Sequence, residues 1–83
     1  MTSANKQIVS ENILNVLGEA RGELALQCAD IMENGLLDSF SLLELAASLE
    51  VSLNITIPTN ELITDNFRNL NAIVRLVDGL SEH

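Results

Sequence analysis

Residues 35–45 read GLLDSFSLLEL and mark the point where a loop turns into a helix. Gly35 can adopt backbone angles that other residues avoid, and Asp38 can accept hydrogen bonds from the first amide groups of a helix. Apolar residues then recur at helical spacing, at Leu42, Leu45, Ala46 and Leu49. The sequence therefore predicts that Ser39 lies exposed at a helix start, where a group can be attached.

Other segments also have the apolar period of a helix. A helix is expected over residues 5–18, with Ser3 or Asn5 as a candidate cap. Its apolar residues form one stripe, at Val9, Ile13, Val16 and Leu17. Residues 69–80 form another, through Leu70, Ile73, Leu76, Val77 and Leu80. Thr59 or Asn60 can cap a short helix over residues 60–64. The third long helix, the one that starts at Ser39, is expected over residues 39–52.

The remaining stretches are predicted to be loops. Gly18 and Gly22 weaken the helical signal, so a long, partly packed loop is expected before Leu37, with a helical turn near residues 24–32. Residues 52–58 alternate like a strand, but no second strand candidate exists to pair with them, which favours an extended connector. The predicted fold is an all-α bundle of three long helices and one short helix, with a long loop after the first, in one domain over residues 1–83.

Composition excludes several classes of protein. Hydrophobic residues make up 47% of the chain, too many for a disordered tail, but only Phe40 and Phe67 are aromatic, so the core must be aliphatic. No apolar run is long enough to span a membrane, and residues 1–6 lack the features of a secretory signal. A cytoplasmic protein without stable membrane insertion is expected.

The negative charge is concentrated around Ser39. The formal net charge is -8, and no Lys or Arg occurs between Arg21 and Arg68. That interval contains eight acids, which are Glu23, Asp30, Glu33, Asp38, Glu44, Glu50, Glu61 and Asp65. Such a field repels nucleic acid and favours basic partner surfaces, although acids of this kind also serve simply to keep a small domain soluble.

The inventory of reactive residues is thin for an enzyme. Cys28 lies among apolar residues and is interpreted as a small buried hydrophobe, while His83 is the last residue. The chain has no glycine-rich phosphate loop and no metal-binding spacing, so neither catalysis nor a metal site is expected. Ser39 also has no histidine nearby to activate it, which favours a hydroxyl that a separate enzyme modifies.

The motif Asp38-Ser39-Phe40 resembles the Asp-Ser-Leu signature of the acyl carrier protein family, which stands at the head of the second family helix. The resemblance runs from about Ile8 to Leu80 and includes Glu44, the segment 55–58 and the closing segment 66–73. It implies a non-catalytic carrier with a 4′-phosphopantetheine arm, derived from coenzyme A, on Ser39. A phosphopantetheinyl transferase would attach the arm, using a divalent metal that Asp38 helps to position. Acyl or aminoacyl cargo would then be carried as a thioester.

The resemblance also implies a docking surface on the outer face of the helix at residues 39–52. Ser41, Glu44, Ser48 and part of Ala47 are expected to face outward and to make this face small and polar. The implied partner-binding residues are Phe40, Leu43, Glu44, Ala47 and Glu50, with Ile57 and Leu62 at the far end. The partners would be a loading ligase and acyl-transfer enzymes with basic docking surfaces, and the carrier itself would be a monomer.

Departures from the family pattern bear on the cargo. Phe40 replaces the usual leucine, and acids are sparse along the second family helix. Both features argue against housekeeping fatty-acid synthesis. The segment at residues 65–68, DNFR, with residues 71–73 behind it, resembles stand-alone carriers of specialised pathways, including aminoacyl or D-alanyl carriers and polyketide or hybrid assembly lines. The alternative is a helical adaptor that keeps the fold but binds partners without a cofactor, in which case Ser39 is dispensable.

Overall fold

The structure, a computed structural model, describes residues 3–81, so His83 lies outside the described residues. Within that range the chain forms helices and loops, with no strand. The elements are α1 (Ser3–Leu17), α2 (Glu19–Gln27), α3 (Ser39–Leu53), two short 3-10 helices η1 (Thr59–Glu61) and η2 (Thr64–Phe67), and α4 (Leu70–Ser81). The predicted all-helical bundle is confirmed.

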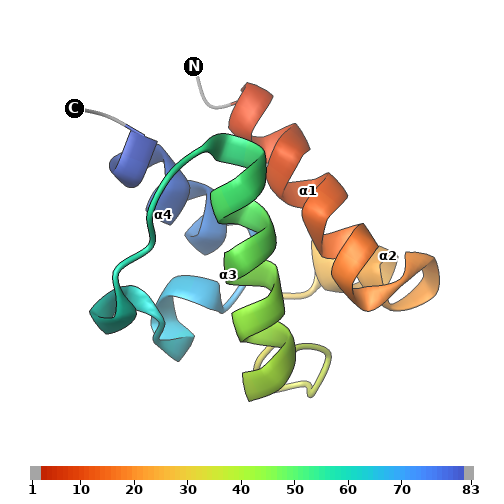
Figure 1. Cartoon of the computed structure of the whole chain (residues 1–83). Helices are drawn as coiled ribbons and strands as arrows, with labels where there is room; N and C mark the ends of the chain where they lie inside the picture. The colour runs from red at the N-terminus through yellow and green to blue at the C-terminus, as the bar shows by residue number, and fades with distance from the viewer. Residues whose placement is uncertain (1–2, 82–83) are drawn as a thin grey trace.

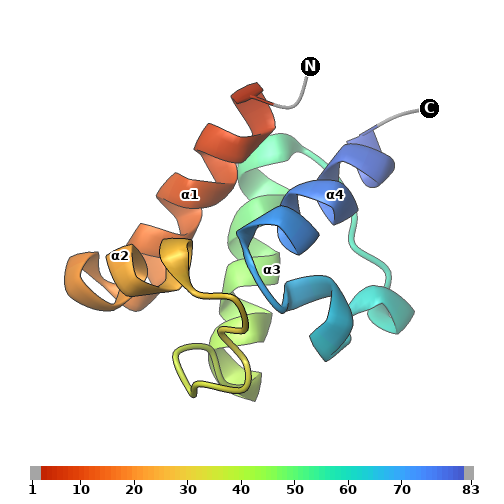
Figure 2. The same ribbon diagram turned by 180° about the vertical axis from the view of Figure 1, so that it is seen from behind.

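Helix α1 packs against α2, α3 and α4 and so links the helices of the bundle (Figures 1 and 2). Helix α3 begins at the end of the molecule that lies opposite the start of α1 and the end of α4 (Figure 1). The loop that connects α2 to α3 lies beside this same end (Figure 2). The residues around Ser39 are therefore distant from both ends of the described chain.

The three long helices lie close to their predicted bounds of 5–18, 39–52 and 69–80. Helix α3 ends where Asn54 adopts the left-handed conformation, with φ 54°. Its backbone N–H donates to the Glu50 carbonyl, the usual way in which such a residue terminates a helix. The extended connector that the sequence predicts then follows at residues 55–58.

The prediction of a loop directly after α1 is wrong over Glu19–Gln27, which form α2. Gly18 separates the two helices with φ +86°, a conformation that favours glycine. Gly22 has a different role, because a Cβ at this position would lie 2.7 Å from Leu14 Cδ2 and 2.9 Å from Leu14 Cα. Glycine thus lets α2 pack closely on α1, and the tertiary contact outweighs its low helix propensity.

The predicted short helix at residues 60–64 is replaced by η1 and η2, which are separated by Leu62 and Ile63. The Asn66 side chain links the two turns. Its Nδ2 donates to the Glu61 carbonyl at 2.8 Å and to Glu61 Oε1 at 2.9 Å. These two hydrogen bonds hold η2 against η1, so they stabilise two short turns in place of one longer helix.

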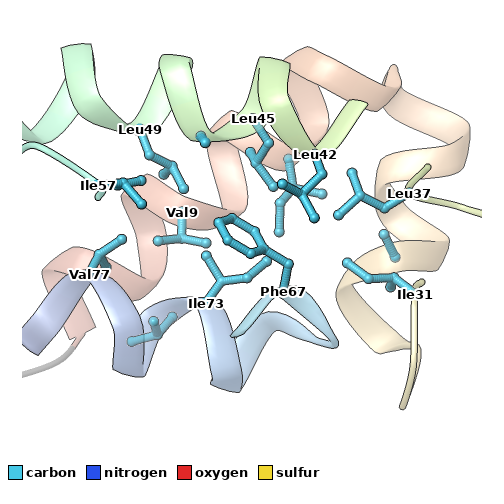
Figure 3. Close-up of a cluster of buried hydrophobic side chains, with 14 residues drawn as sticks. Val9, Ile31, Leu37, Leu42, Leu45, Leu49, Ile57, Phe67, Ile73 and Val77 are labelled. Carbon is cyan, nitrogen blue, oxygen red and sulfur yellow. The ribbon is translucent and has the colours of Figure 1, made fainter. Parts of the chain in front are cut away.

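The core is almost entirely aliphatic, with Phe67 at its centre between α3 and α4 (Figure 3). The Phe67 side chain is 0% exposed. The buried cluster comprises Val9, Ile13, Ala25, Ile31, Leu37, Leu42, Leu45, Ala46, Leu49, Ile57, Phe67, Ile73, Val74 and Val77. The apolar stripes predicted in α1, α3 and α4 therefore meet in one core.

One polar cluster lies at the contact between α1 and α3. Asn12 is buried, and its Nδ2 donates to the Ile8 carbonyl at 2.8 Å. The hydroxyls of Ser48 and Ser52 both donate to Asn12 Oδ1. The prediction that Ser48 faces outward is therefore wrong, because a buried amide on a neighbouring helix needs its hydroxyl as a partner.

Candidate functional site

Ser39 is the first residue of α3 and is exposed. Asp38 caps the helix from an extended conformation, and its Oδ1 accepts a hydrogen bond from the Ser41 backbone N–H at 2.8 Å. The Asp38 carbonyl accepts the first helical bond, from the Leu42 N–H at 2.8 Å. The cap holds the Ser39 backbone in place while its hydroxyl stays on the surface, as the sequence predicts.

The loop before Ser39 is held by buried and backbone contacts. Leu37 is 1% exposed, and its N–H donates to the Ile31 carbonyl at 3.0 Å. The Ile31 N–H in turn donates to the Arg68 carbonyl at 2.7 Å, which links the loop to the segment before α4. Gly35 turns the chain with φ +78°. Ser39 follows directly after the buried Leu37 and the cap residue Asp38, and this limits its range of positions.

The charge state of Asp38 follows from the same cap. The hydrogen bond from the Ser41 backbone amide lowers the pKa of Asp38 below its usual value of 3.8, and the Ser41 side chain and the positive charge of Arg21 act in the same direction. The charged form of Asp38 is therefore favoured in the folded state. The cap contributes its full stabilisation at pH values above the pKa that Asp38 has in the unfolded chain. Its contribution disappears as the pH falls through the lower, folded pKa.

We expect Asp38→Ala to lower the melting temperature near neutral pH, because the Ser41 amide loses its partner. The difference from the wild type should shrink as the pH falls well below 3.8, where the wild-type carboxylate is also protonated. Thermal unfolding followed by circular dichroism at both pH values measures this. Asp38→Asn is the matched control: it keeps a capping oxygen, so it should stay close to wild type near neutral pH. Equal melting temperatures for the alanine variant and the wild type at neutral pH would contradict the capping role.

Apolar side chains lie beside Ser39. A small pocket of about 210 Å³ lies beside it, lined by Met32, Ser39, Leu42, Leu43, Leu62 and Thr64. On the surface of α3, Phe40 is 70% exposed and Leu43 is 54% exposed. No group of three or more metal-ligating side chains that could hold an ion is found within residues 3–81. The arrangement is thus an accessible hydroxyl beside apolar surface.

No family model matches the chain, but several known proteins are similar to it over most of its length. A D-alanyl carrier protein of Leuconostoc mesenteroides is 36% identical over 74 residues, which cover 87% of this chain and 95% of that protein. The chain belongs to the acyl/D-alanyl carrier protein family. A D-alanyl carrier protein of Bacillus velezensis is 37% identical over 84% of this chain and 94% of its own length. One of Lactobacillus delbrueckii is 28% identical over 89% of this chain and 95% of its own length.

Membership of the carrier family assigns the chain the role of a carrier protein. The resemblance seen in the sequence implies a non-catalytic chain with a phosphopantetheine arm. The residues of this chain are compatible with such an arm, because Ser39 is exposed at the start of α3 and carries the required hydroxyl. No helix of the described range has the length and apolar character needed to cross a membrane.

The residues expected to bind partners of this carrier separate into two groups. Phe40, Leu43, Glu44 and Ala47 are exposed on α3. Glu50 is half-buried, and its Oε2 accepts a hydrogen bond from the Ile57 N–H at 2.7 Å, so it holds the connector against α3. Ile57 is only 6% exposed and belongs to the core, while Leu62 is partly buried beside the pocket. Glu50 and Ile57 thus make contacts within the chain, and their expected role in partner binding stays a prediction.

Two residues of interest are not among the predicted site residues. Val51 is 85% exposed and lies on the same face of α3 as Phe40 and Ala47. The prediction of a small, polar outer face is therefore wrong for α3, whose exposed face contains an apolar stripe. Arg21 is the second, because its Nη2 donates to the Gly35 and Leu36 carbonyls in the loop before Ser39. The spacing of Phe40, Leu43, Ala47 and Val51 could have revealed the stripe, but no local pattern indicates the contact of Arg21.

Proposed function

We propose that this chain carries a 4′-phosphopantetheine arm on Ser39 and transfers a cargo that is bound to the arm as a thioester. The observation that supports the proposal is the exposed hydroxyl of Ser39 at the start of α3. A transferase and the attached arm must both reach this oxygen, and burial would prevent either. The first amides of α3 and the positive end of its dipole also favour an anionic phosphodiester at this place.

The attachment step needs a separate enzyme. In this step Ser39 Oγ forms a new P–O bond, the pyrophosphate bond of coenzyme A breaks, and the nucleotide half leaves as a bisphosphate. The hydroxyl proton passes to a base of the transferase, because no histidine of residues 3–81 is available for it. Asp38 stays charged in the folded chain and is exposed beside Ser39, so its carboxylate can help position the divalent metal that the transferase uses. The reaction belongs to the cytoplasm, where coenzyme A and the transferase are available.

The proposed cargo is D-alanine, since the similar proteins are named D-alanyl carrier proteins. The pocket beside Ser39 has a volume of about 210 Å³, which is small for a long acyl chain. The acids on both sides of Ser39 also favour a cargo with a positive charge, such as an aminoacyl group with its free ammonium. An ATP-dependent ligase would load this cargo, and acyl-transfer enzymes would then take it. A fatty-acid or polyketide cargo remains the other candidate within the carrier class.

The proposed docking surface is the exposed apolar stripe of α3, defined by Phe40, Leu43, Ala47 and Val51, with Glu44 beside it. An exposed row of apolar residues on one helix face is typical of a helix that inserts into a groove of a partner. The stripe starts next to Ser39, so a partner bound there would have the arm at its edge. Glu44 and the other acids would steer basic partner surfaces toward the same face.

Loading in two stages tests this function. We expect the purified chain to gain one phosphopantetheinyl unit with coenzyme A, magnesium ions and a broad-range transferase, as measured by intact mass. With ATP and a D-alanine ligase, the modified chain should then gain one alanyl unit, and neutral hydroxylamine should release it because it is a thioester. A chain that stays unmodified while a control carrier is loaded would favour the adaptor alternative. If the arm accepts only fatty acyl groups, D-alanine is not the cargo, while the proposed arm on Ser39 still holds.

A further inference from the structure

Arg21 makes a contact between two elements that the carrier role does not by itself explain. It lies on α2, and its Nη2 donates to the Gly35 carbonyl and to the Leu36 carbonyl, each at 3.2 Å. Both acceptors belong to the loop that leads into Asp38 and Ser39. A guanidinium group has several donors in a fixed plane, so one of its nitrogens can bond to two neighbouring carbonyls at once.

The helix that carries Arg21 is firmly placed. The next residue, Gly22, is buried so close to Leu14 of α1 that a Cβ would lie 2.7 Å from the Leu14 Cδ2. Helix α2 therefore packs closely against α1, and the Arg21 side chain extends from α2 to the loop. In the loop, Gly35 turns the chain with φ +78° and Leu37 is buried. The turn and the buried leucine therefore hold the Gly35 and Leu36 carbonyls in place.

We propose that Arg21 is a positioning residue for the modification of Ser39, because it holds the loop before the α3 cap in the form that the transferase binds. The inference depends on the proposed function of Ser39. A loop that is already ordered in the free chain loses less conformational entropy when a partner binds it. Without Arg21, the transferase would have to order the segment at residues 35–38 itself, at the expense of affinity.

Three variants test the inference by steady-state kinetics of phosphopantetheinyl transfer. We expect Arg21→Gln to lower kcat/KM by about five-fold, mainly through a higher KM, because the lost contacts order the ground-state loop and do not touch the reacting atoms. Arg21→Lys keeps a cationic donor and should recover at least part of the loss. Arg75→Gln is the matched control, since it removes the same charge from an exposed position on α4 and should behave as wild type.

Hydrogen exchange of the free chain separates loop ordering from a direct contact with the transferase. The Leu37 amide, which donates to the Ile31 carbonyl at 3.0 Å, should exchange faster in Arg21→Gln, whereas amides in the middle of α3 should not change. A raised KM with unchanged Leu37 exchange would overturn the inference, as would an equal loss in Arg75→Gln. Loss of the helical circular dichroism signal in Arg21→Gln would also overturn it, because Arg21 would then be needed for folding as a whole. If the wild type itself gains no arm, the proposed function fails first and the role of Arg21 fails with it.

Discussion

Replacement of Ser39 by alanine is expected to abolish the gain in mass that coenzyme A and a phosphopantetheinyl transferase produce in the wild type. The expected loss is complete, because the Ser39 hydroxyl supplies the oxygen of the new phosphodiester bond and alanine has no atom to replace it. Folding should be unaffected, since Ser39 is exposed and the α3 cap is made by the Asp38 side chain and the Ser41 amide. Intact-mass spectrometry and circular dichroism of the same samples measure both outcomes.

Ser41→Ala is the matched control for this experiment. Ser41 lies two residues further along α3 and has the same functional group, but it is partly buried and lies beyond the helix start. Its variant should therefore still gain one phosphopantetheinyl unit. Modification of Ser39→Ala to the wild-type extent would show that another residue accepts the arm. An unmodified wild type together with full activity of Ser39→Ala in its host pathway would instead support the adaptor alternative.

Truncation of Phe67 is expected to have the largest effect on stability. The ring is 0% exposed at the centre of the core, so Phe67→Ala should lower the free energy of unfolding by about 3–5 kcal/mol. That loss is a large share of the ~5–15 kcal/mol that stabilises a typical domain, so the variant should be partly unfolded at physiological temperature. Urea unfolding followed by circular dichroism measures the change.

The second phenylalanine provides an internal control for Phe67. Phe40 is 70% exposed on α3, so Phe40→Ala should change the free energy of unfolding by no more than about 0.5 kcal/mol. The two substitutions remove the same atoms, and only burial differs between them. Similar unfolding curves for the two variants would contradict the arrangement of the core in Figure 3.

The elements with a regular local pattern could be predicted from the sequence. Helix α3 combines an aspartate cap with apolar residues at helical spacing, and it begins at Ser39 as expected. Helices α1 and α4 likewise lie close to their predicted bounds. Such signals depend only on neighbouring residues, so they can be recognised without any knowledge of the rest of the fold. The exposed position of Ser39 follows from the same local signals.

The features that depend on distant partners could not be predicted. Helix α2 contains Gly22, whose low helix propensity suggested a loop, while its close contact with Leu14 becomes visible only when the two helices are packed together. Ser48 has the spacing of a surface residue, but its hydroxyl pairs with Asn12, which lies 36 residues earlier in the chain. In the same way, the partner of Glu50 is a backbone amide on the connector, which a helix pattern alone does not indicate.

Mapping the modified residue in the chain isolated from its own cells shows whether Ser39 carries the arm. Trypsin cleaves after Lys and Arg, so residues 22–68 are released as one peptide that contains Ser39, Ser41, Ser48 and Ser52. Fragmentation of this peptide in the mass spectrometer locates any added group. We predict one phosphopantetheinyl group, with or without its cargo, on Ser39. A peptide that carries no such group in any molecule, or carries it on a residue other than Ser39, would rule out Ser39 as the attachment site.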